Sequence, residues 1–172
     1  MQMDEIELEV SNIKIAFTCD SQGLQDFKNS CTIAKNYSNF SVLKLTFTYI
    51  IFWSAGYINV TKIKKKEDIE KARKEFETVS QISLHPKATI HNIFAHTKIE
   101  LKSKSLKWIY DNIEFENSQV YFNTSFYPGL RIKSKNGTLI IFQSGKVTSL
   151  GSNSFSSLEQ LRRKCVFILQ QL

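Results

Sequence analysis

The chain has 172 residues, of which 42% are hydrophobic and 12% aromatic, so it can bury a packed core and is not a disordered chain. Its formal net charge of +7 and sequence pI near 9.3 suit a polyanionic partner such as nucleic acid. The longest apolar run, Phe47–Ala55, is far shorter than a membrane span. The start of the chain is acidic, unlike a signal peptide. Its three scattered cysteines oppose a disulfide framework or a zinc site and favour a reducing compartment.

The first predicted elements are a strand, a variable stretch, several more strands and a helix. The first strand begins at Val10. The later strands are predicted at Phe40–Thr48, Tyr49–Phe52 and Tyr57–Lys62. The closing helix is indicated by helical spacing of Ile69, Ala72, Arg73 and Phe76.

The same order of elements begins again at Ile90. The variable stretch here has helical spacing at Leu106, Ile109, Tyr110 and Ile113. Strands are predicted at Gly129–Lys133, Thr138–Phe142 and Lys146–Leu150, and Lys135-Asn-Gly-Thr138 is typical of a hairpin turn. The last helix has an apolar stripe at Leu158, Leu161, Cys165, Ile168 and Leu169.

Matching short sequence motifs show that the chain contains an internal repeat. Asn12 and Asn92 each precede Ile and lie 80 positions apart. An Ile-Ile-Phe string ends at Phe52 and again at Phe142, 90 positions later, and Ser54 matches Ser144. We therefore expect two tandem repeats, over residues 5–83 and 87–172, joined near His85-Pro86. Consecutive hairpin strands favour an antiparallel sheet with the helices on one face, which is an α+β fold.

The second repeat resembles the TATA-box-binding protein family. The motifs on which this resemblance rests are Tyr127-Pro-Gly-Leu130, Leu139-Ile-Ile-Phe142, Ser144-Gly-Lys-Val147 and Leu150-Gly151. The first repeat keeps looser versions of them. The resemblance implies a saddle, in which one curved antiparallel sheet of about ten strands has four helices on its convex face. The family is itself the standard example of a protein that widens and kinks the DNA minor groove with inserted aromatic rings.

The resemblance also implies which residues contact DNA. Asn12 and Asn92 would be central amides that donate to A·T base edges, which offer only acceptors in the minor groove. The aromatic wedges would be Phe40 and Phe52 in the first repeat and Tyr127 and Phe142 in the second. The remaining groove and phosphate contacts would be Ile50, Ile140, Thr61, Lys44, Lys133 and Lys146.

Several positions depart from the family's pattern and make the expected DNA face more polar and less symmetric. Tyr127 replaces a wedge Phe, and Leu150 replaces a Thr. The other changes are Lys14, Asn59 and Thr148 in place of Val, and Lys62 in place of the Gly that follows Thr61. The segment Phe122–Phe126 stands where the family has an acidic stirrup for a general transcription factor, and it has no carboxylate.

These patterns predict a transcription initiation factor that binds and bends A/T-rich duplex DNA and recruits general transcription factors or the RNA polymerase machinery. We expect it in the nucleus, or at a viral transcription site if the source is a virus, and not at a membrane. Two alternatives stay open: an interaction module that keeps the fold without sequence-specific DNA binding, and a substrate-binding module of the kind appended to nucleases and glycosylases. An open apolar face would also favour a homodimer when the protein is free.

Catalysis is not expected. The sequence has no H-E-x-x-H, G-x-S-x-G, P-loop or Rossmann glycine pattern. His91 and His96 lie five positions apart, so on a strand they face opposite sides and cannot ligate one metal. We therefore expect no enzyme activity, no metal and no cofactor.

Overall fold

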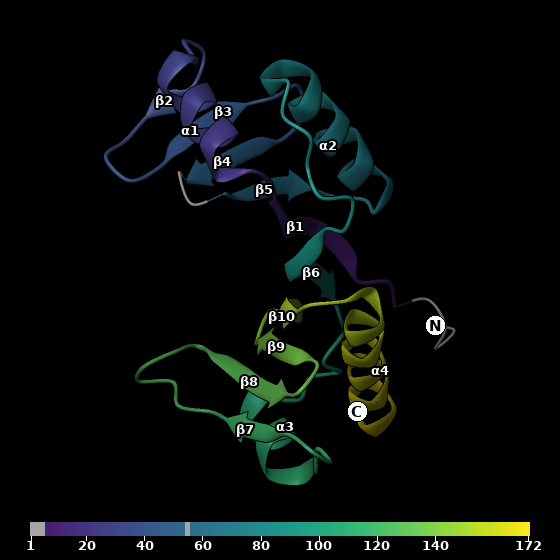
Figure 1. Cartoon of the computed structure of the whole chain (residues 1–172). Coiled ribbons are helices and arrows are strands. Elements are labelled where there is room, and N and C mark those ends of the chain that lie inside the picture. Colours follow the sequence, from purple (N-terminus) through teal and green to yellow (C-terminus); the bar gives the residue numbers. More distant parts are fainter. Residues whose placement is uncertain (1–5, 54–55) are drawn as a thin grey trace. The chain divides into compact units, whose positions relative to one another are not determined.

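The computed structural model of the chain describes residues 6–53 and 56–172 (Figure 1). Within these residues it contains ten strands and four helices, and the order strand, helix, four strands, helix occurs twice. All the strand pairs described below are antiparallel, so the predicted α+β fold is confirmed. The predicted start of the first repeat at residue 5, and Ser54, lie outside the described residues.

The chain forms two compact units, and the first comprises Asn12–His91. We call it the first-repeat unit. Its strands follow the order β2-β3-β4-β5-β1. Its elements are β1 (Glu9–Thr18), α1 (Ser21–Ser30), β2 (Lys35–Asn36), β3 (Ser41–Lys44), β4 (Tyr49–Trp53), β5 (Tyr57–Ile63) and α2 (Glu67–Ser80).

The second-repeat unit comprises Asn92–Leu172 and the described residues before Asn12. Its strands follow the equivalent order β6-β10-β9-β8-β7. Its elements are β6 (Thr89–Lys98), α3 (Leu106–Asn112), β7 (Gln119–Tyr121), β8 (Gly129–Ser134), β9 (Gly137–Phe142), β10 (Lys146–Ser152) and α4 (Phe155–Gln171). Figure 1 shows α4 running beside β9 and β10, against which it packs.

The core of the first-repeat unit lies between its strands and its two helices. Because side chains alternate across a strand, one face of β1 buries Ile13, Ile15 and Phe17. On the same side, Phe52 of β4 packs against Phe27 of α1, with ring centroids 5.6 Å apart, and the ring of Phe76 of α2 lies 6.4 Å from it. The helices therefore cover this face of the sheet.

Element boundaries agree with the prediction except where a turn was taken for a strand. The predicted strand Phe40–Thr48 ends at Lys44, because the Leu45 amide donates to the Thr48 carbonyl and closes a turn. Glu75 of α2 holds this turn by accepting from the Thr46 amide at 2.7 Å. The predicted hairpin is confirmed, since Ser134 pairs with Gly137 across it. A helix after the first strand was expected in each repeat, and α1 confirms it in the first, although its bounds were not predicted. The short strands β2 and β7 were not located from the sequence.

The first described residues pack onto the second-repeat unit rather than the first. Ile6 and Leu8 are buried, and the Arg162 guanidinium on α4 donates to the Ile6 carbonyl at 3.2 Å. The segment thus adds apolar side chains to the core beneath α4. None of the helices in the described residues is long and apolar enough to cross a membrane.

Candidate nucleic-acid interface

In each repeat, one face of the strands is left uncovered by the helices, and we call it the open face. In the second-repeat unit, Leu139 and Ile141 of β9 are fully buried under the helices. The alternating residues Ile140 and Phe142 are half-buried and lie on the open face. The open faces are therefore lined by the strand residues that alternate with the core.

Asn12 and Asn92 occupy equivalent positions on the first strands of the two repeats, β1 and β6. The Asn12 Oδ1 atom accepts the backbone N–H of Lys62 at 2.6 Å, and the Asn92 Oδ1 atom accepts the backbone N–H of Gly151 at 2.6 Å. A backbone N–H only donates, so each amide must turn its oxygen toward the chain. The Nδ2 group of each side chain is thereby directed away from that bond, as a donor.

The two predicted aromatic residues of the second repeat meet on its open face. The rings of Tyr127 and Phe142 have centroids 6.0 Å apart, and the Arg131 guanidinium lies 5.3 Å from the Tyr127 ring. Gly129 makes room for this cluster, since a Cβ there would lie 2.8 Å from Ile140 and 3.0 Å from the Tyr127 ring. The cluster is built from β8, β9 and the loop that precedes β8.

In the first repeat, the structure corrects two of the predicted contact residues. Ile50 and Phe52 are both 0% exposed, and Phe52 packs among the rings of α1 and α2. Their side chains therefore belong to the core. The neighbouring residues Ile51 and Trp53 occupy the open face instead.

Phe40 joins Trp53 in an aromatic cluster on the open face of the first repeat. The Phe40 and Trp53 ring centroids are 6.1 Å apart, and Tyr37 stacks on Phe40 at 4.7 Å. This cluster occupies the position that Tyr127 and Phe142 occupy in the second repeat. The sequence identified Phe40 of this cluster but not Trp53.

Strand pairing explains the error. Tyr49 pairs with Thr61 in the first repeat, and Thr138 pairs with Leu150 in the second. Equivalent residues of β4 and β9 are therefore 89 positions apart, as are Thr61 and Leu150, and not 90. A shift of one residue moves every side chain to the opposite face of a strand. The missed residues Ile51 and Trp53 could have been found by applying the spacing of Thr61 and Leu150 to the whole hairpin.

The other predicted residues lie on the open faces. Thr61 is half-buried on β5, and Lys44, Lys133 and Lys146 are exposed. Lys44 and Lys133 are equivalent, because Lys44 pairs with Tyr49 and Lys133 pairs with Thr138. Across the described part of the chain these three lysines form no salt bridge.

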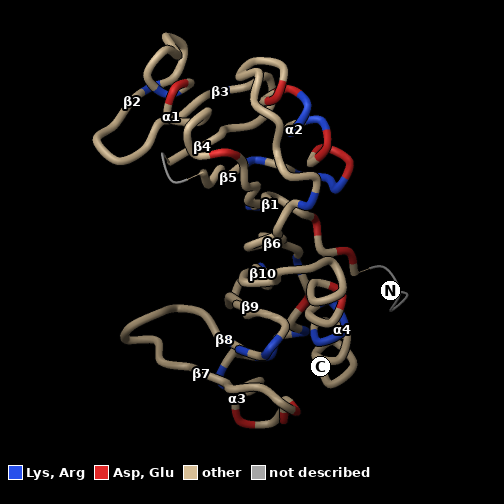
Figure 2. The backbone as a smooth tube through the Cα atoms, in the orientation of Figure 1, with Lys and Arg blue, Asp and Glu red and all other residues tan. Residues whose placement is uncertain are grey.

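The charges on the helices are arranged differently. Figure 2 shows acidic and basic residues mixed along α2. There Arg73 bridges Glu70 and Glu77, and its hydrogen bond to Glu70 lowers the pKa of that carboxyl. Acidic and basic side chains thus offset each other along α2, whereas Lys44 and Lys133 on the open faces form no salt bridge within the described residues, which favours anion binding there.

Two carboxylates lie near the ends of β6 and β10 in the second-repeat unit. Glu9 lies 3.4 Å from the His96 Nε2 atom. Together with Glu7, these side chains border a shallow cavity of about 700 Å³ whose other lining residues include Lys98 and Lys146. Any anion that binds these lysines has to compete with the two glutamates.

The matching family model describes "Transcription factor TFIID (or TATA-binding protein, TBP)" and covers residues 87–172, half of the chain. The chain belongs to the TATA-binding protein family. Its fold is also that of a solved structure, the Methanococcus jannaschii TBP, with a TM-score of 0.74 at 20% sequence identity over 97% of this chain and 100% of that chain. No curated protein matches this chain.

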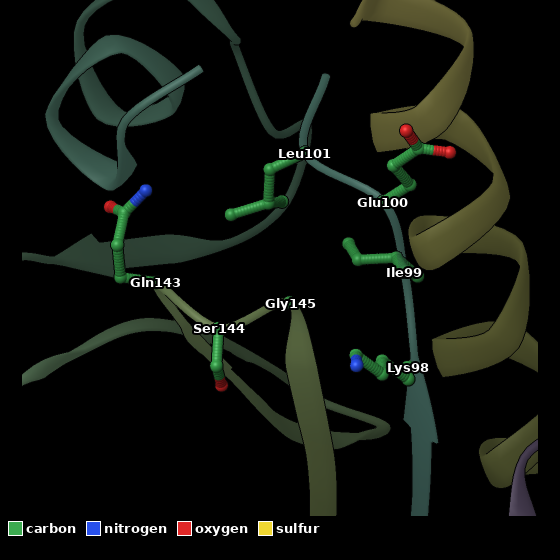
Figure 3. A pocket seen from close by; sticks show the side chains of 7 residues that line it. All are labelled: Lys98, Ile99, Glu100, Leu101, Gln143, Ser144 and Gly145. Atoms are coloured by element: carbon green, nitrogen blue, oxygen red, sulfur yellow. The ribbon is translucent and has the colours of Figure 1, made fainter. Parts of the chain in front are cut away.

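The TATA-binding protein family is non-enzymatic. In residues 6–53 and 56–172 no group of His, Cys, Asp and Glu could hold a metal ion. The cavity in Figure 3, about 370 Å³, lies between Lys98–Leu101 and the turn Gln143–Gly145. The Ile99 amide donates to the Gly145 carbonyl at 2.9 Å, and a Cβ on Gly145 would lie 2.1 Å from the Ile99 carbonyl oxygen. Tightly packed backbone therefore borders this cavity.

Proposed function

We propose that this member of the TATA-binding protein family binds A/T-rich duplex DNA in the minor groove with the open faces of both repeats, and bends it. The observation that carries the proposal is the pair of fixed amides, Asn12 and Asn92. Each holds its oxygen against a backbone N–H and leaves its nitrogen to donate. Adenine N3 and thymine O2 are acceptors, and A·T pairs present no donor in the minor groove.

The two aromatic clusters support bending. Tyr127 with Phe142, and Phe40 with Trp53, are half-buried ring pairs on open faces. Rings held in this way are suited to wedge between base steps and unstack them. Ile140 and Ile51 would add apolar contacts in the groove and Thr61 a hydroxyl, whereas Ile50 and Phe52 take no part because they are in the core.

Phosphate contacts are the role proposed for Lys44, Lys133 and Lys146, the exposed cations of the open faces. Neutralising phosphates releases counterions, so DNA binding should weaken as salt rises. These contacts position the protein on the duplex without reading its sequence.

The proposed role is transcription initiation, with general transcription factors or RNA polymerase machinery as protein partners and the nucleus, or a viral transcription site, as its location. The proposed repeat boundaries remain residues 5–83 and 87–172. A pure interaction module is the second candidate, favoured by one observation. In the segment Phe122–Phe126, Phe126 is 87% exposed. Aromatic side chains are enriched at protein interfaces, so Phe126 is a candidate anchor for a protein partner.

A binding titration with a bend-reporting duplex tests the proposal. One duplex has an A·T centre and the other is G·C-rich, and each is titrated at several salt concentrations with the wild type and with Phe142→Ala. We expect tighter binding and bending of the A·T duplex, with bending lost in the variant. Sequence-blind binding without bending, unaffected by Phe142→Ala, would reject the proposal and favour the interaction module. Light scattering of the protein without DNA gives its mass in solution, which tests the expected homodimer.

A further inference from the structure

The open faces of the two repeats differ most next to the central amides. Lys14 on β1 occupies the position of Phe94 on β6, counted from Asn12 and Asn92. Thr61 on β5 occupies the position of Leu150 on β10, as the strand pairing shows. The first repeat therefore flanks its amide with a cation and a hydroxyl, and the second flanks its amide with a ring and an aliphatic side chain.

A third difference lies at the residue that binds each amide. Lys62 and Gly151 donate to Asn12 and Asn92 in the same way, and both have left-handed backbone, with φ of 64° and 82°. This conformation favours glycine, yet the first repeat has a lysine there. The Lys62 Nζ atom lies 4.3 Å from the centroid of the Tyr49 ring, which places the ammonium group on the open face.

These differences change which base pairs each half can accept. In the minor groove a G·C pair adds one donor, the guanine N2 amino group, to the acceptors that every pair presents. The Thr61 hydroxyl can accept from that amino group, and the ammonium groups of Lys14 and Lys62 can donate to the acceptors. Phe94 and Leu150 offer no acceptor, so a guanine amino group pressed against them would be buried without a partner, which is costly.

Resting on the DNA binding proposed above, we propose that the chain reads two unlike half-sites. The second repeat requires A·T pairs next to the centre of the site, and the first repeat tolerates G·C pairs there. Because only one orientation then satisfies a mixed site, the protein binds such a site in one direction.

Two outer pairs do not contribute to this choice. Lys44 and Lys133 are equivalent and identical, and Asn59 and Thr148 are equivalent and both polar. We assign the choice of half-site to the residues beside the central amides, which are Lys14, Thr61 and Lys62 against Phe94, Leu150 and Gly151.

Three duplexes of one length test the half-site rule with the full chain. The inner base pairs are A·T in both halves, A·T in one half and G·C in the other, or G·C in both. We expect the mixed duplex to bind within about twofold of the first, and the last to bind about a hundredfold more weakly, the usual cost of two unfavourable base pairs. A mixed duplex that falls midway between the other two would overturn the proposal.

Direction is measured by energy transfer from a fluorophore on Cys31, a half-buried residue of the first-repeat unit. Burial raises the pKa of the Cys165 thiol to about 12, and Cys19 is replaced by Ser, so Cys31 is the thiol that reacts. The acceptor dye is attached to either end of the mixed duplex. We expect efficient transfer only from the end nearer the G·C half. Equal transfer from both ends would overturn the proposal.

Exchanging the residues sharpens the test. The variant Lys14→Phe/Thr61→Leu/Lys62→Gly/Phe94→Lys/Leu150→Thr/Gly151→Lys should reverse the direction and keep the affinity for the mixed duplex. Lys44→Gln is the matched control, which should weaken all three duplexes equally and leave the direction unchanged. If no duplex binds more tightly than random DNA, the proposed function fails; binding to the A·T duplex without direction on the mixed one rejects the half-site rule alone.

Discussion

The two repeats contain the same Ile-Ile-Phe string and use it in opposite ways. In the first repeat the final ring, Phe52, is in the core between α1 and α2, and in the second the final ring, Phe142, lies on the open face. The two strings differ by a single residue in their place along otherwise equivalent strands. A motif therefore does not fix a role in a sheet: the pairing of its strand decides which face each residue serves.

The largest expected effect is the loss of stability when the buried ring of the first repeat is removed. Phe52→Ala should lower the free energy of unfolding by about 3–5 kcal/mol, because it leaves a cavity among Phe27 and Phe76. Phe142→Ala, on the open face, should cost about 1 kcal/mol or less while reducing DNA bending. Urea unfolding of both variants measures the difference. Similar losses of stability in the two would show that Phe142 is also a core residue.

A smaller effect should separate the two functions of the central amides. Asn92→Asp keeps an oxygen for the Gly151 amide but replaces the donor with a charge. We expect stability to change by less than about 0.5 kcal/mol and the affinity for A·T duplex to fall about tenfold or more. Asn92→Ala is the comparison variant, and it should lose about 1 kcal/mol of stability as well. Fluorescence titration and thermal unfolding give the two readings.

Exchanging the left-handed residues should produce opposite changes of about 1 kcal/mol. Lys62→Gly removes a side chain from an unfavourable backbone conformation, and Gly151→Lys introduces one where a Cβ would meet no atom closer than 3.7 Å. We expect the first variant to be more stable and the second less stable in urea unfolding. Lys62→Ala keeps the unfavourable backbone and should show no gain.

The smallest expected effect concerns a buried hydroxyl. Among the described residues, the Ser149 hydroxyl is buried without a hydrogen-bond partner, and its equivalent in the first repeat is Val60. Ser149→Ala should therefore raise stability by about 0.5–1 kcal/mol. Val60→Ser is the reverse experiment, and it should be destabilising. A loss of stability in Ser149→Ala would mean that the hydroxyl has a partner in solution.

Much of the fold could be predicted from the sequence because its signals are local. The hairpin at Lys135–Thr138 has the Asn-Gly turn that tight hairpins need, and the stripe on α4 has clear helical spacing. The bounds of α1 could not be predicted because its apolar face has just two residues, Leu24 and Phe27, although the repeat led us to expect a helix there. The sequence did not reveal β2 and β7 because strands of two and three residues are too short for a pattern.

The candidate site was less predictable because it depends on pairing between strands. Asn12 and Asn92 were found through an identical neighbour, but their bonds to Lys62 and Gly151 join residues that are 50 and 59 positions apart. Trp53 was missed because Phe52 matches the familiar motif better, and only the partner strand shows which of the two faces outward. Whether these residues contact DNA stays a prediction for the titrations to decide.

The position of Ile6 and Leu8 affects how the chain folds as it leaves the ribosome. These residues are synthesised before the first-repeat unit, yet they pack with α4, and Arg162 of that helix binds the Ile6 carbonyl. The first-repeat unit is a continuous stretch and can fold while synthesis continues. Ile6 and Leu8 can pack only after α4 has been synthesised. During translation they therefore stay exposed until α4 appears, which makes them a natural target for a chaperone that binds nascent chains.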